Sequence, residues 1–409
     1  MLYLNWDGFS YDYYQEAHHR GMVPVIDDLI KKGTFFSNTW CGVPAITNPM
    51  QTAIASGAYS LATGNVKIHY DKTRKVVVQQ RRENNAENIV QALTRQGVSV
   101  ASVHHFTFEE NGCSCLDPAR PFIYTEGANY QDRFDELLNL YSGKKVQING
   151  ERRNVVLSPR FVAVYFDDLD TIGHNNGKLV RKATTEPERF NHVLDRLRLM
   201  DTALGNFLKN MQNLSLYRDM SVFLITDHGM TPFAFGDDSS FARNDLFESF
   251  NHFSLQVELL SAGESPQAGT DVVLCTAGLS MLVSWISEKA ISRTEEVLAF
   301  LSQKPYIGKL MTADELIKEG SFPFCDVYIS PRPPLIFKNA PEAIGAGHDS
   351  LDGSSRRIFS LAWGKGIQQG LNIGRRVQNI DFAPTMTAIL GVNPPGQSVG
   401  KVIEECLIQ

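Results

Sequence analysis

The stretch Val222–Met230 reads V-F-L-I-T-D-H-G-M and indicates the class of fold. Its four leading apolar residues predict a strand buried on both faces, which is typical of a parallel sheet in an α/β protein. Asp227 and His228 follow at the carboxyl end of this strand, and in such sheets ligands bind beyond the carboxyl ends. The pair is therefore part of a metal or acid–base site, or a helix cap beside an incidental histidine. The rest of the chain decides between these interpretations.

Strand-like and helical segments alternate along the chain. Strands are expected at Leu2–Trp6, Thr34–Trp40, Val98–His104, Phe161–Phe166, Val272–Cys275, Leu279–Trp285, Cys325–Ile329 and Ile358–Trp363. Helices are expected at Val23–Lys32, Glu87–Gln96, Asp132–Tyr141, Pro187–Met211, Arg293–Ser302, Ala313–Glu319 and Ile380–Leu390. This alternation predicts an α/β fold, a doubly wound and mostly parallel sheet flanked by helices.

The simplest domain organisation is a single catalytic domain over residues 1–409 with inserted cap segments. The insertions are expected near 66–86, 106–160 and 231–270. The last of these, rich in Phe, Ser, Asp and Asn, is expected to be loop-like.

Composition excludes several classes of function. The 409 residues carry a net charge of −6 without a long basic run, so no nucleic-acid-binding surface is evident. No apolar stretch reaches the length of a membrane span. A strand-like segment begins at residue 2 in place of a signal peptide, which predicts a cytoplasmic protein, or an extracytoplasmic one if a leader has been removed. Six cysteines are sparse for this length and do not imply a disulfide framework. The oligomeric state is left open.

Six acidic and histidine side chains follow expected strands or lie in glycine-containing loops: Asp7, Asp170, His174, Asp227, His228 and His348. Asp170-Thr-Ile-Gly-His174 places a carboxylate and an imidazole four positions apart, in what is expected to be a loop that bends at the glycine. Carboxylate and imidazole ligands without cysteine suit catalytic zinc or manganese. Each residue alone is ordinary, but all six at one sheet edge predict two metal sites.

Thr47, in Pro44-Ala-Ile-Thr47-Asn-Pro49, is the candidate nucleophile. It stands at the expected start of a helix, where free N–H groups and the helix dipole favour an anionic phosphoryl group. A threonine hydroxyl needs a base or a metal to activate it, and the alternative is a plain N-cap. Asn65 is a second candidate, as an amide donor to a phosphate oxygen or as an ordinary turn residue.

Five motifs in this order resemble the alkaline phosphatase superfamily, and most closely its type I phosphodiesterase/nucleotide pyrophosphatase family. They are Asp7-Gly-Phe, the Thr47 loop, Asp170-x-x-Gly-His174, Thr226-Asp-His-Gly229 and Gly347-His348. The segment Asn379-Ile-Asp-Phe-Ala-Pro-Thr-Met is similar to the closing helix of that family.

The resemblance implies an alkaline-phosphatase-like core and a metal-dependent hydrolase of phosphate diesters or pyrophosphates, acting on a small-molecule phosphate ester. One zinc ion is expected on Asp170, His174 and His348, and the other on Asp7, Asp227 and His228 with the Thr47 oxygen. Thr47 is expected to form a phosphothreonine intermediate. Asn65 and the backbone N–H of Asn48 are expected to hold phosphate oxygens.

Two departures from the family pattern leave nucleotide specificity open. Thr-Phe-Pro-Asn is replaced by Thr47-Asn-Pro-Met50, and Tyr-Pro-Glu-Ser-His-Gly is shortened to Tyr59-Ser-Leu-Ala-Thr-Gly64. A carbon–phosphorus hydrolase similar to phosphonoacetate hydrolase, or a phosphomonoesterase, remains an alternative on the same metal ligands. A sulfatase is disfavoured because Cys41-Gly-Val-Pro does not fit its Cys-x-Pro-x-Arg pattern. Because all six ligands and the hydroxyl are present, we expect an enzyme rather than a binding module.

Overall fold

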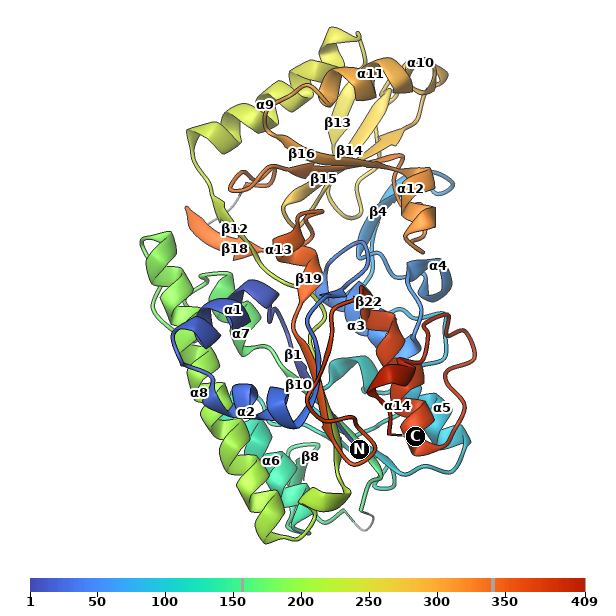
Figure 1. The fold of residues 1–409 in the computed structure, drawn as a ribbon. Helices are drawn as coiled ribbons and strands as arrows, with labels where there is room; N and C mark the ends of the chain where they lie inside the picture. Colours follow the sequence, from blue (N-terminus) through green and yellow to red (C-terminus); the bar gives the residue numbers. More distant parts are fainter. Residues whose placement is uncertain (156–157, 340–342, 409) are drawn as a thin grey trace.

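The computed structural model describes residues 1–155, 158–339 and 343–408, and it contains a large sheet and a smaller one, each with its own helices (Figure 1). In the view of Figure 1 the large sheet lies in the lower half and the small sheet in the upper half. The candidate site residues belong to the large sheet and to the segments that connect the two.

The large sheet has eight strands in the order β21-β2-β20-β11-β1-β10-β6-β7. Their bounds are Leu371–Ile373, Gly33–Phe36, Ser360–Gly364, Ser221–Ile225, Leu2–Trp6, Phe161–Phe166, Val100–Val103 and Phe122–Ile123, respectively. All neighbouring strands are parallel except at β20, which is antiparallel to both of its neighbours. This arrangement confirms the predicted α/β class with a mostly parallel sheet.

The register brings the carboxyl ends of the three central strands to one edge. Leu4 of β1 pairs with Val164 of β10 on one side and with Leu224 of β11 on the other. The residues that follow these strands therefore emerge next to one another, as expected for an open α/β sheet.

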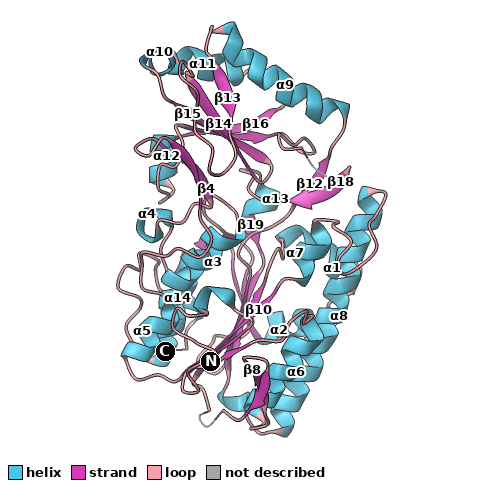
Figure 2. Cartoon of the chain, turned by 180° about the vertical axis from the view of Figure 1, so that it is seen from behind, coloured by secondary structure: helices cyan, strands magenta, loops and turns pink. Residues whose placement is uncertain are grey.

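Side-chain alternation along β1 separates the two faces of the sheet. Leu2, Leu4 and Trp6 face the helices α1 (Tyr11–His19), α2 (Pro24–Lys32), α6 (Tyr130–Tyr141) and α8 (Glu186–Asn213). Tyr3 faces the helices α3 (Thr47–Ser56), α5 (Ile89–Arg95) and α14 (Phe382–Leu390). Figure 2 shows these helix layers on opposite sides of the strands. The period of two along a strand thus produces two separate cores.

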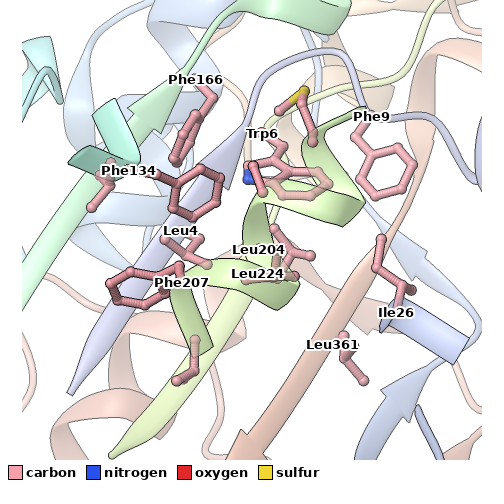
Figure 3. Close-up of a cluster of buried hydrophobic side chains, with 14 of the residues drawn as sticks. Leu4, Trp6, Phe9, Ile26, Phe134, Phe166, Leu204, Phe207, Leu224 and Leu361 are labelled. Carbon is pink, nitrogen blue, oxygen red and sulfur yellow. The ribbon is translucent and has the colours of Figure 1, made fainter. Parts of the chain in front are cut away.

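The core under α8 is rich in aromatic rings. Trp6 lies against Phe9 and Phe166, and Phe134 of α6 packs between Phe166 and Phe207 of α8 (Figure 3). Because Trp6 immediately precedes Asp7, this packing anchors the end of β1 from which that carboxylate projects.

Residues 237–337 form the smaller sheet with its own core. Its five strands run in the order β13-β14-β15-β17-β16, with bounds Val257–Leu259, Val272–Ala277, Ser280–Trp285, Val327–Pro331 and Ile307–Thr312. Helices α9 (Asp237–His252), α10 (Glu288–Ser292), α11 (Thr294–Leu301) and α12 (Ala313–Lys318) accompany it. We call residues 237–337 the cap.

Two expectations about the cap were wrong. Residues 231–270 are not loop-like, because α9 occupies 16 residues of them. Its buried Ala242, Leu246 and Phe250 recur every four positions, but polar residues surround them and the helical pattern is weak in the sequence. The strands expected at 272–275, 279–285 and 325–329 exist, but they belong to the cap sheet and not to the large parallel sheet.

The remaining elements are short. The strands are β3 (Thr39–Trp40), β4 (Ile68–Asp71), β5 (Val76–Gln79), β8 (Val146–Ile148), β9 (Glu151–Arg153), β12 (Thr231–Ala234), β18 (Ile344–Gly347), β19 (Arg357–Ile358) and β22 (Val377–Gln378). The helices are α4 (Ser60–Thr63), α7 (Asp168–Gly173) and α13 (Gly353–Arg356), with 3₁₀ turns at Phe106–Phe108, Tyr217–Asp219, Asn379–Asp381 and Glu404–Cys406. The expected insertion at 66–86 contains the β4–β5 hairpin, and that at 106–160 contains β7, α6, β8 and β9. The description of the whole chain as one domain stays a prediction.

None of the helices that the structure describes combines the length and the apolar character required to cross a membrane.

Candidate metal centre

The loops that follow β1, β10 and β11 meet at the carboxyl edge of the large sheet. Asp7 follows β1 directly, Asp227 is the second residue after β11, and Asp170 lies on α7, just after β10. Gly8 permits this approach: it has φ +72°, and a Cβ added to it would lie 3.0 Å from the Asp170 Cα. A side chain at position 8 would therefore separate two of the acidic groups.

Asp170 and His174 lie on a helical turn, not on the loop that we expected. They are four residues apart on and just after α7, so they share one face of the helix, and His174 Nε2 is 3.3 Å from Asp170 Oδ1. Gly173 between them lies where a Cβ would approach Met230 Cε to 2.6 Å. The glycine thus allows close packing of α7 rather than a bend.

The first group of candidate ligands consists of Asp7, Asp227 and His228, which are all buried. His228 Nε2 is 3.4 Å from Asp7 Oδ1 and 3.5 Å from Asp227 Oδ2. The second oxygen of each carboxylate is already bound: Tyr165 donates its hydroxyl to Asp7 Oδ2, and Gly8 N–H donates to Asp227 Oδ1. The oxygens that remain face the same imidazole nitrogen.

His228 is oriented so that Nε2 is available as an acceptor. Its Nδ1 lies 3.0 Å from the carbonyl oxygen of Gly229, which assigns the ring proton to Nδ1. Nε2 then presents its lone pair to the carboxylates and to Thr47 Oγ1, which is 3.0 Å away. The imidazole therefore has the tautomer that a metal ligand requires.

The second group combines Asp170 and His348 with His228. His348 Nε2 is 3.9 Å from Asp170 Oδ1, and the His228 and His348 rings lie 4.1 Å apart between centroids. His174 completes the group from the other side, with its ring centroid 5.2 Å from that of His348. The structure thus brings together all six residues that the sequence predicted as metal ligands.

The donor atoms of both groups fit a cation. Asp7 Oδ1, Asp170 Oδ1, Asp227 Oδ2 and His348 Nδ1 are buried without a hydrogen-bond partner. Unpaired buried carboxylate oxygens are costly unless a cation balances them. Separations of 3.4 and 3.5 Å also match roughly the 3.4 Å edge of a tetrahedron of ligands about zinc. The residues present therefore suit divalent ions of the zinc or manganese type.

The pKa values of three of these side chains are shifted because the groups are covered by protein and lie close to one another. Burial, followed by the charges of Asp227 and Asp170, raises the pKa of Asp7 well above its usual value. Burial also acts to raise the pKa of Asp170, but the imidazoles of His174 and His348 outweigh it and hold that pKa below its usual range. Burial and the neighbouring His228 lower the pKa of His348. Two buried carboxylates and a third that is mostly covered thus lie close enough to affect one another's pKa values, and a cation between them would relieve their repulsion.

Thr47 is the first residue of α3, where its hydroxyl faces the first group. The residue in the N-cap position is Ile46, which has no polar side chain to bind the free N–H groups of the helix. Thr47 is therefore not the N-cap, and its hydroxyl lies beside His228 instead. The helix presents N–H groups and the positive end of its dipole next to this hydroxyl.

Asn65 is arranged differently from our expectation. It is buried and donates its two amide hydrogens to the carbonyl oxygens of Arg81 and Glu83, at 3.1 and 2.9 Å. Its side-chain oxygen accepts the N–H of Lys67. The amide thus has no free hydrogen for a phosphate oxygen in this structure, and a contact with substrate would require these bonds to break.

The cap holds the loop that carries His348. Tyr328 of β17 donates its hydroxyl to the Asp349 carboxylate, and Ser280 donates to the Asp349 carbonyl at 2.6 Å. The Asp349 N–H in turn donates to the carbonyl of Ala45, in the loop before Thr47. Burial raises the pKa of Asp349 to about 8. These bonds fix His348 relative to both the cap and the nucleophile loop.

Removal of the Tyr328 hydroxyl tests this coupling. We expect Tyr328→Phe to lower both zinc affinity and kcat/KM by about 10-fold, because direct partners of metal ligands have effects of about 10- to 100-fold and Tyr328 acts on His348 only through the neighbouring Asp349. Tyr306→Phe is the matched control, since Tyr306 also donates to a carboxylate in the cap, that of Asp245, at 2.8 Å. Equal behaviour of the two variants in metal titration and kinetics would contradict the coupling.

A cavity of about 340 Å³ has Tyr165, the hydrogen-bond partner of Asp7, in its wall. Its walls include the aromatic rings of Phe106, Tyr124 and Tyr165, together with Arg133 and Asp167. Tyr165 connects the cavity to the centre, because its hydroxyl binds Asp7. A larger cavity, lined by Met1, Ser158 and Ser221 among others, lies at the opposite edge of the sheet.

His105 lies next to this cavity but is part of the core. It is completely buried, with ring centroids 5.4 Å from Tyr3 and 4.5 Å from Phe108, and neither of its ring nitrogens has a hydrogen-bond partner. Burial lowers its pKa from 6.5 to about 3. The folded protein therefore keeps this imidazole neutral at pH values where the unfolded chain protonates it.

This difference predicts a pH-dependent stability. The unfolded chain takes up the proton near pH 6.5 and the folded protein only near 3, so the stability contributed by neutral His105 is present above 6.5 and lost as the pH falls. Between pH 7 and pH 5 we expect the free energy of unfolding of wild type to fall by about 2 kcal/mol more than that of His105→Phe, which has no imidazole at this position. Denaturant unfolding of both proteins at both pH values measures this difference. His19→Phe, at an exposed position of α1, is the control, and an equal change in both variants would refute the assignment.

The fold and the centre together define a class: an α/β protein with a paired carboxylate–imidazole centre and a threonine hydroxyl at one sheet edge. The chain belongs to the type I phosphodiesterase / nucleotide pyrophosphatase family, whose sequence pattern matches residues 1–295. This range contains every predicted site residue except His348. The match confirms the family predicted from the sequence motifs.

The sequence is also similar to that of a human protein. Over 239 residues the chain is 24% identical to ectonucleotide pyrophosphatase/phosphodiesterase family member 1 of Homo sapiens. The matched segment covers 56% of this chain and 23% of the relative, so the chain spans only a part of that protein's length.

Two residues that bind the centre or the loop of His348 were missed by the sequence analysis. Tyr165, which binds Asp7, is the fifth residue of β10 and could have been suspected as a polar group near the end of a buried strand. Tyr328, which binds Asp349, comes from the cap, and nothing in its local sequence indicates this position.

Proposed function

We propose that the chain is a metal-dependent hydrolase of small-molecule phosphate diesters or pyrophosphates, with Thr47 as the nucleophile. The observation that carries this proposal is the position of the Thr47 hydroxyl, 3.0 Å from His228 Nε2, beside buried carboxylate oxygens that have no partner. Family membership supports the same class of reaction.

Two divalent ions, zinc or manganese, would be held at the centre. Asp7, Asp227 and His228 would bind one ion together with the Thr47 oxygen, and Asp170, His174 and His348 would bind the other. When bound, such ions neutralise charge on the phosphoryl group and lower the pKa of the hydroxyl and of water. The unpaired atoms of Asp7, Asp170 and Asp227 are the features of this chain that support the assignment.

The chain's own residues would perform the substitution at phosphorus. The Thr47 Oγ1–P bond forms as the bond from phosphorus to the leaving oxygen breaks, and the resulting phosphothreonine ester is then hydrolysed by water. The backbone N–H of Asn48, at the start of α3, would hold a non-bridging oxygen. The next two residues offer none, because Pro49 has no N–H and the Met50 N–H donates to the Ile46 carbonyl. Phe106, Tyr124 and Tyr165 line the cavity that would receive the organic group.

A panel of three substrates tests the reaction class. We expect the zinc-loaded protein to hydrolyse bis-p-nitrophenyl phosphate faster than p-nitrophenyl phosphate, and to release no phosphate from phosphonoacetate. Preference for the monoester or for the phosphonate would replace the proposed substrate class by one of the two alternatives. No hydrolysis of any of them, by protein shown to contain both ions, would reject the proposal.

A further inference from the structure

Three buried polar side chains connect helix α3, which begins with Thr47, to strand β1 of the large sheet. Gln51 of α3 donates a side-chain N–H to Asn5 Oδ1 at 2.7 Å, and Asn5 donates to the Tyr3 hydroxyl at 2.8 Å. Gln51 and Asn5 are completely buried, and so is nearly all of Tyr3. The core around them, between the sheet and α3, α5 and α14, is formed mainly by apolar side chains.

Stability alone does not account for the contact between Gln51 and Asn5. Gln51 Oε1 is buried without a hydrogen-bond partner among the described residues, which is unfavourable. Apolar side chains of the same shape, in place of a buried polar pair, leave stability unchanged or increase it in many proteins. A hydrogen bond adds direction, because it fixes two atoms at a defined distance and angle. The contact therefore fixes the rotation and the height of α3 over the sheet.

The other two buried polar side chains of α3 make different contacts. Thr52 donates to the carbonyl of Asn48 within the helix, at 2.7 Å. Ser56 accepts the amide of Asn84, which belongs to the loop before α5, at 3.0 Å. Of these three side chains, Gln51 is the one whose hydrogen bond reaches the large sheet.

The contact lies one helical turn from the candidate nucleophile. Gln51 follows Thr47 by four residues in α3, and Asn5 precedes Asp7 by two residues along β1. At the centre, Thr47 Oγ1 is 3.0 Å from His228 Nε2, which is 3.4 Å from Asp7 Oδ1. Helix α3 and strand β1 are thus joined twice, once through the centre and once through the amide pair. A rotation of α3 that the amide pair prevents would move the Thr47 oxygen relative to the carboxylate.

We propose that Gln51 and Asn5 are positioning residues that hold the Thr47 oxygen in the orientation required for attack on phosphorus. The inference rests on the proposed function, because it concerns the nucleophile of that reaction. The two amides act only through α3 and β1. Their effect should therefore appear in kcat and not in KM, because the orientation of the nucleophile matters when the bond to phosphorus forms.

Gln51→Met tests the inference in the zinc-loaded protein, because it keeps a side chain of similar length and removes the donor. We expect kcat for bis-p-nitrophenyl phosphate to fall about 10-fold or more, with KM and bound zinc unchanged, since small misplacements of a reacting group have effects of this size. Calorimetry of orthovanadate and inorganic phosphate gives a second readout without turnover. Vanadate takes up the Thr47 oxygen as a fifth ligand, as the transition state does, so its affinity relative to phosphate should fall about 10-fold as well.

The triple variant Tyr3→Phe/Asn5→Leu/Gln51→Met separates positioning from stability. It removes all three polar groups together, so it leaves none of them buried without a partner, and we expect it to unfold at or above the temperature of wild type. It should nevertheless keep the reduced kcat and the reduced vanadate selectivity of Gln51→Met. Recovery of wild-type values would show that only the unpaired amide had caused the loss, and would overturn the inference.

Gln91→Met is the matched control. Gln91 also pairs with a buried asparagine, Asn88, but at the start of α5, which carries no candidate site residue. It should keep the kcat and the vanadate selectivity of wild type. Unchanged vanadate selectivity in Gln51→Met, or an equal fall in Gln91→Met, would overturn the inference. Because this binding is measured without turnover, such a result is distinct from failure of the wild type to hydrolyse bis-p-nitrophenyl phosphate, which would reject the proposed function itself.

Discussion

Thr47→Ala is expected to reduce the turnover of bis-p-nitrophenyl phosphate by about 10⁴-fold or more, as removal of a nucleophile does in other covalent hydrolases. The loss should appear in kcat, because the variant lacks the atom that forms the bond to phosphorus. Bound zinc should persist, since the carboxylate and imidazole groups at positions 7, 170, 174, 227, 228 and 348 are unchanged. Steady-state kinetics measures kcat, and metal analysis of the same sample measures the zinc bound per chain.

Thr52→Ala provides the control for this variant. Thr52 lies one turn further along α3 and donates its hydroxyl to the carbonyl of Asn48 at 2.7 Å, away from the centre. We expect it to keep activity within a few-fold of wild type, and Thr47→Ser to keep part of it. Comparable activity in Thr47→Ala and wild type would show that another group attacks phosphorus.

Removal of divalent ions is the second change with a large expected effect. Chelation should abolish hydrolysis, and zinc or manganese should restore it, because Asp7 Oδ1 and Asp227 Oδ2 are buried without a hydrogen-bond partner among the described residues and face the same side of His228. The midpoint of thermal unfolding should also rise when the ion is returned, since an ion that binds only the folded chain stabilises it.

The number of metal ions per chain that restores full activity shows whether the centre holds one ion or two. We expect activity to rise to a maximum at two ions per chain, with His228→Ala and His348→Ala each reducing the bound metal. Hydrolysis that is indifferent to a chelator, in protein shown to be free of metal, would contradict both sites.

Much of the centre could be predicted from the sequence because its residues follow buried strands. Asp7 and Asp227 stand at the ends of β1 and β11. Neighbouring parallel strands end side by side, so these positions are adjacent irrespective of the conformation of the loops. The order of the motifs then identified the family. Helices with strong apolar periodicity, such as α8, were also predicted close to their observed bounds.

The rest depended on contacts between segments far apart in the chain. Tyr328 is 21 residues from Asp349 in sequence and meets it only because the cap sheet folds over the loop. Asn65 was expected to face the substrate, but the segment at Arg81–Glu83 returns to occupy its amide. Because the helical pattern of α9 is weak, the insertion expected near 231–270 was predicted to be loop-like. Local propensity does not report such tertiary partners.

The most direct test of the central claim is the mass of the Thr47 peptide after acid quenching of a reaction with bis-p-nitrophenyl phosphate. The account predicts a p-nitrophenyl phosphoryl group on Thr47 of the wild type, absent in Thr47→Ala and present in Thr52→Ala. Such an adduct requires attack of the threonine oxygen on a diester. Steady turnover with an unmodified Thr47 peptide at every quench time would contradict it.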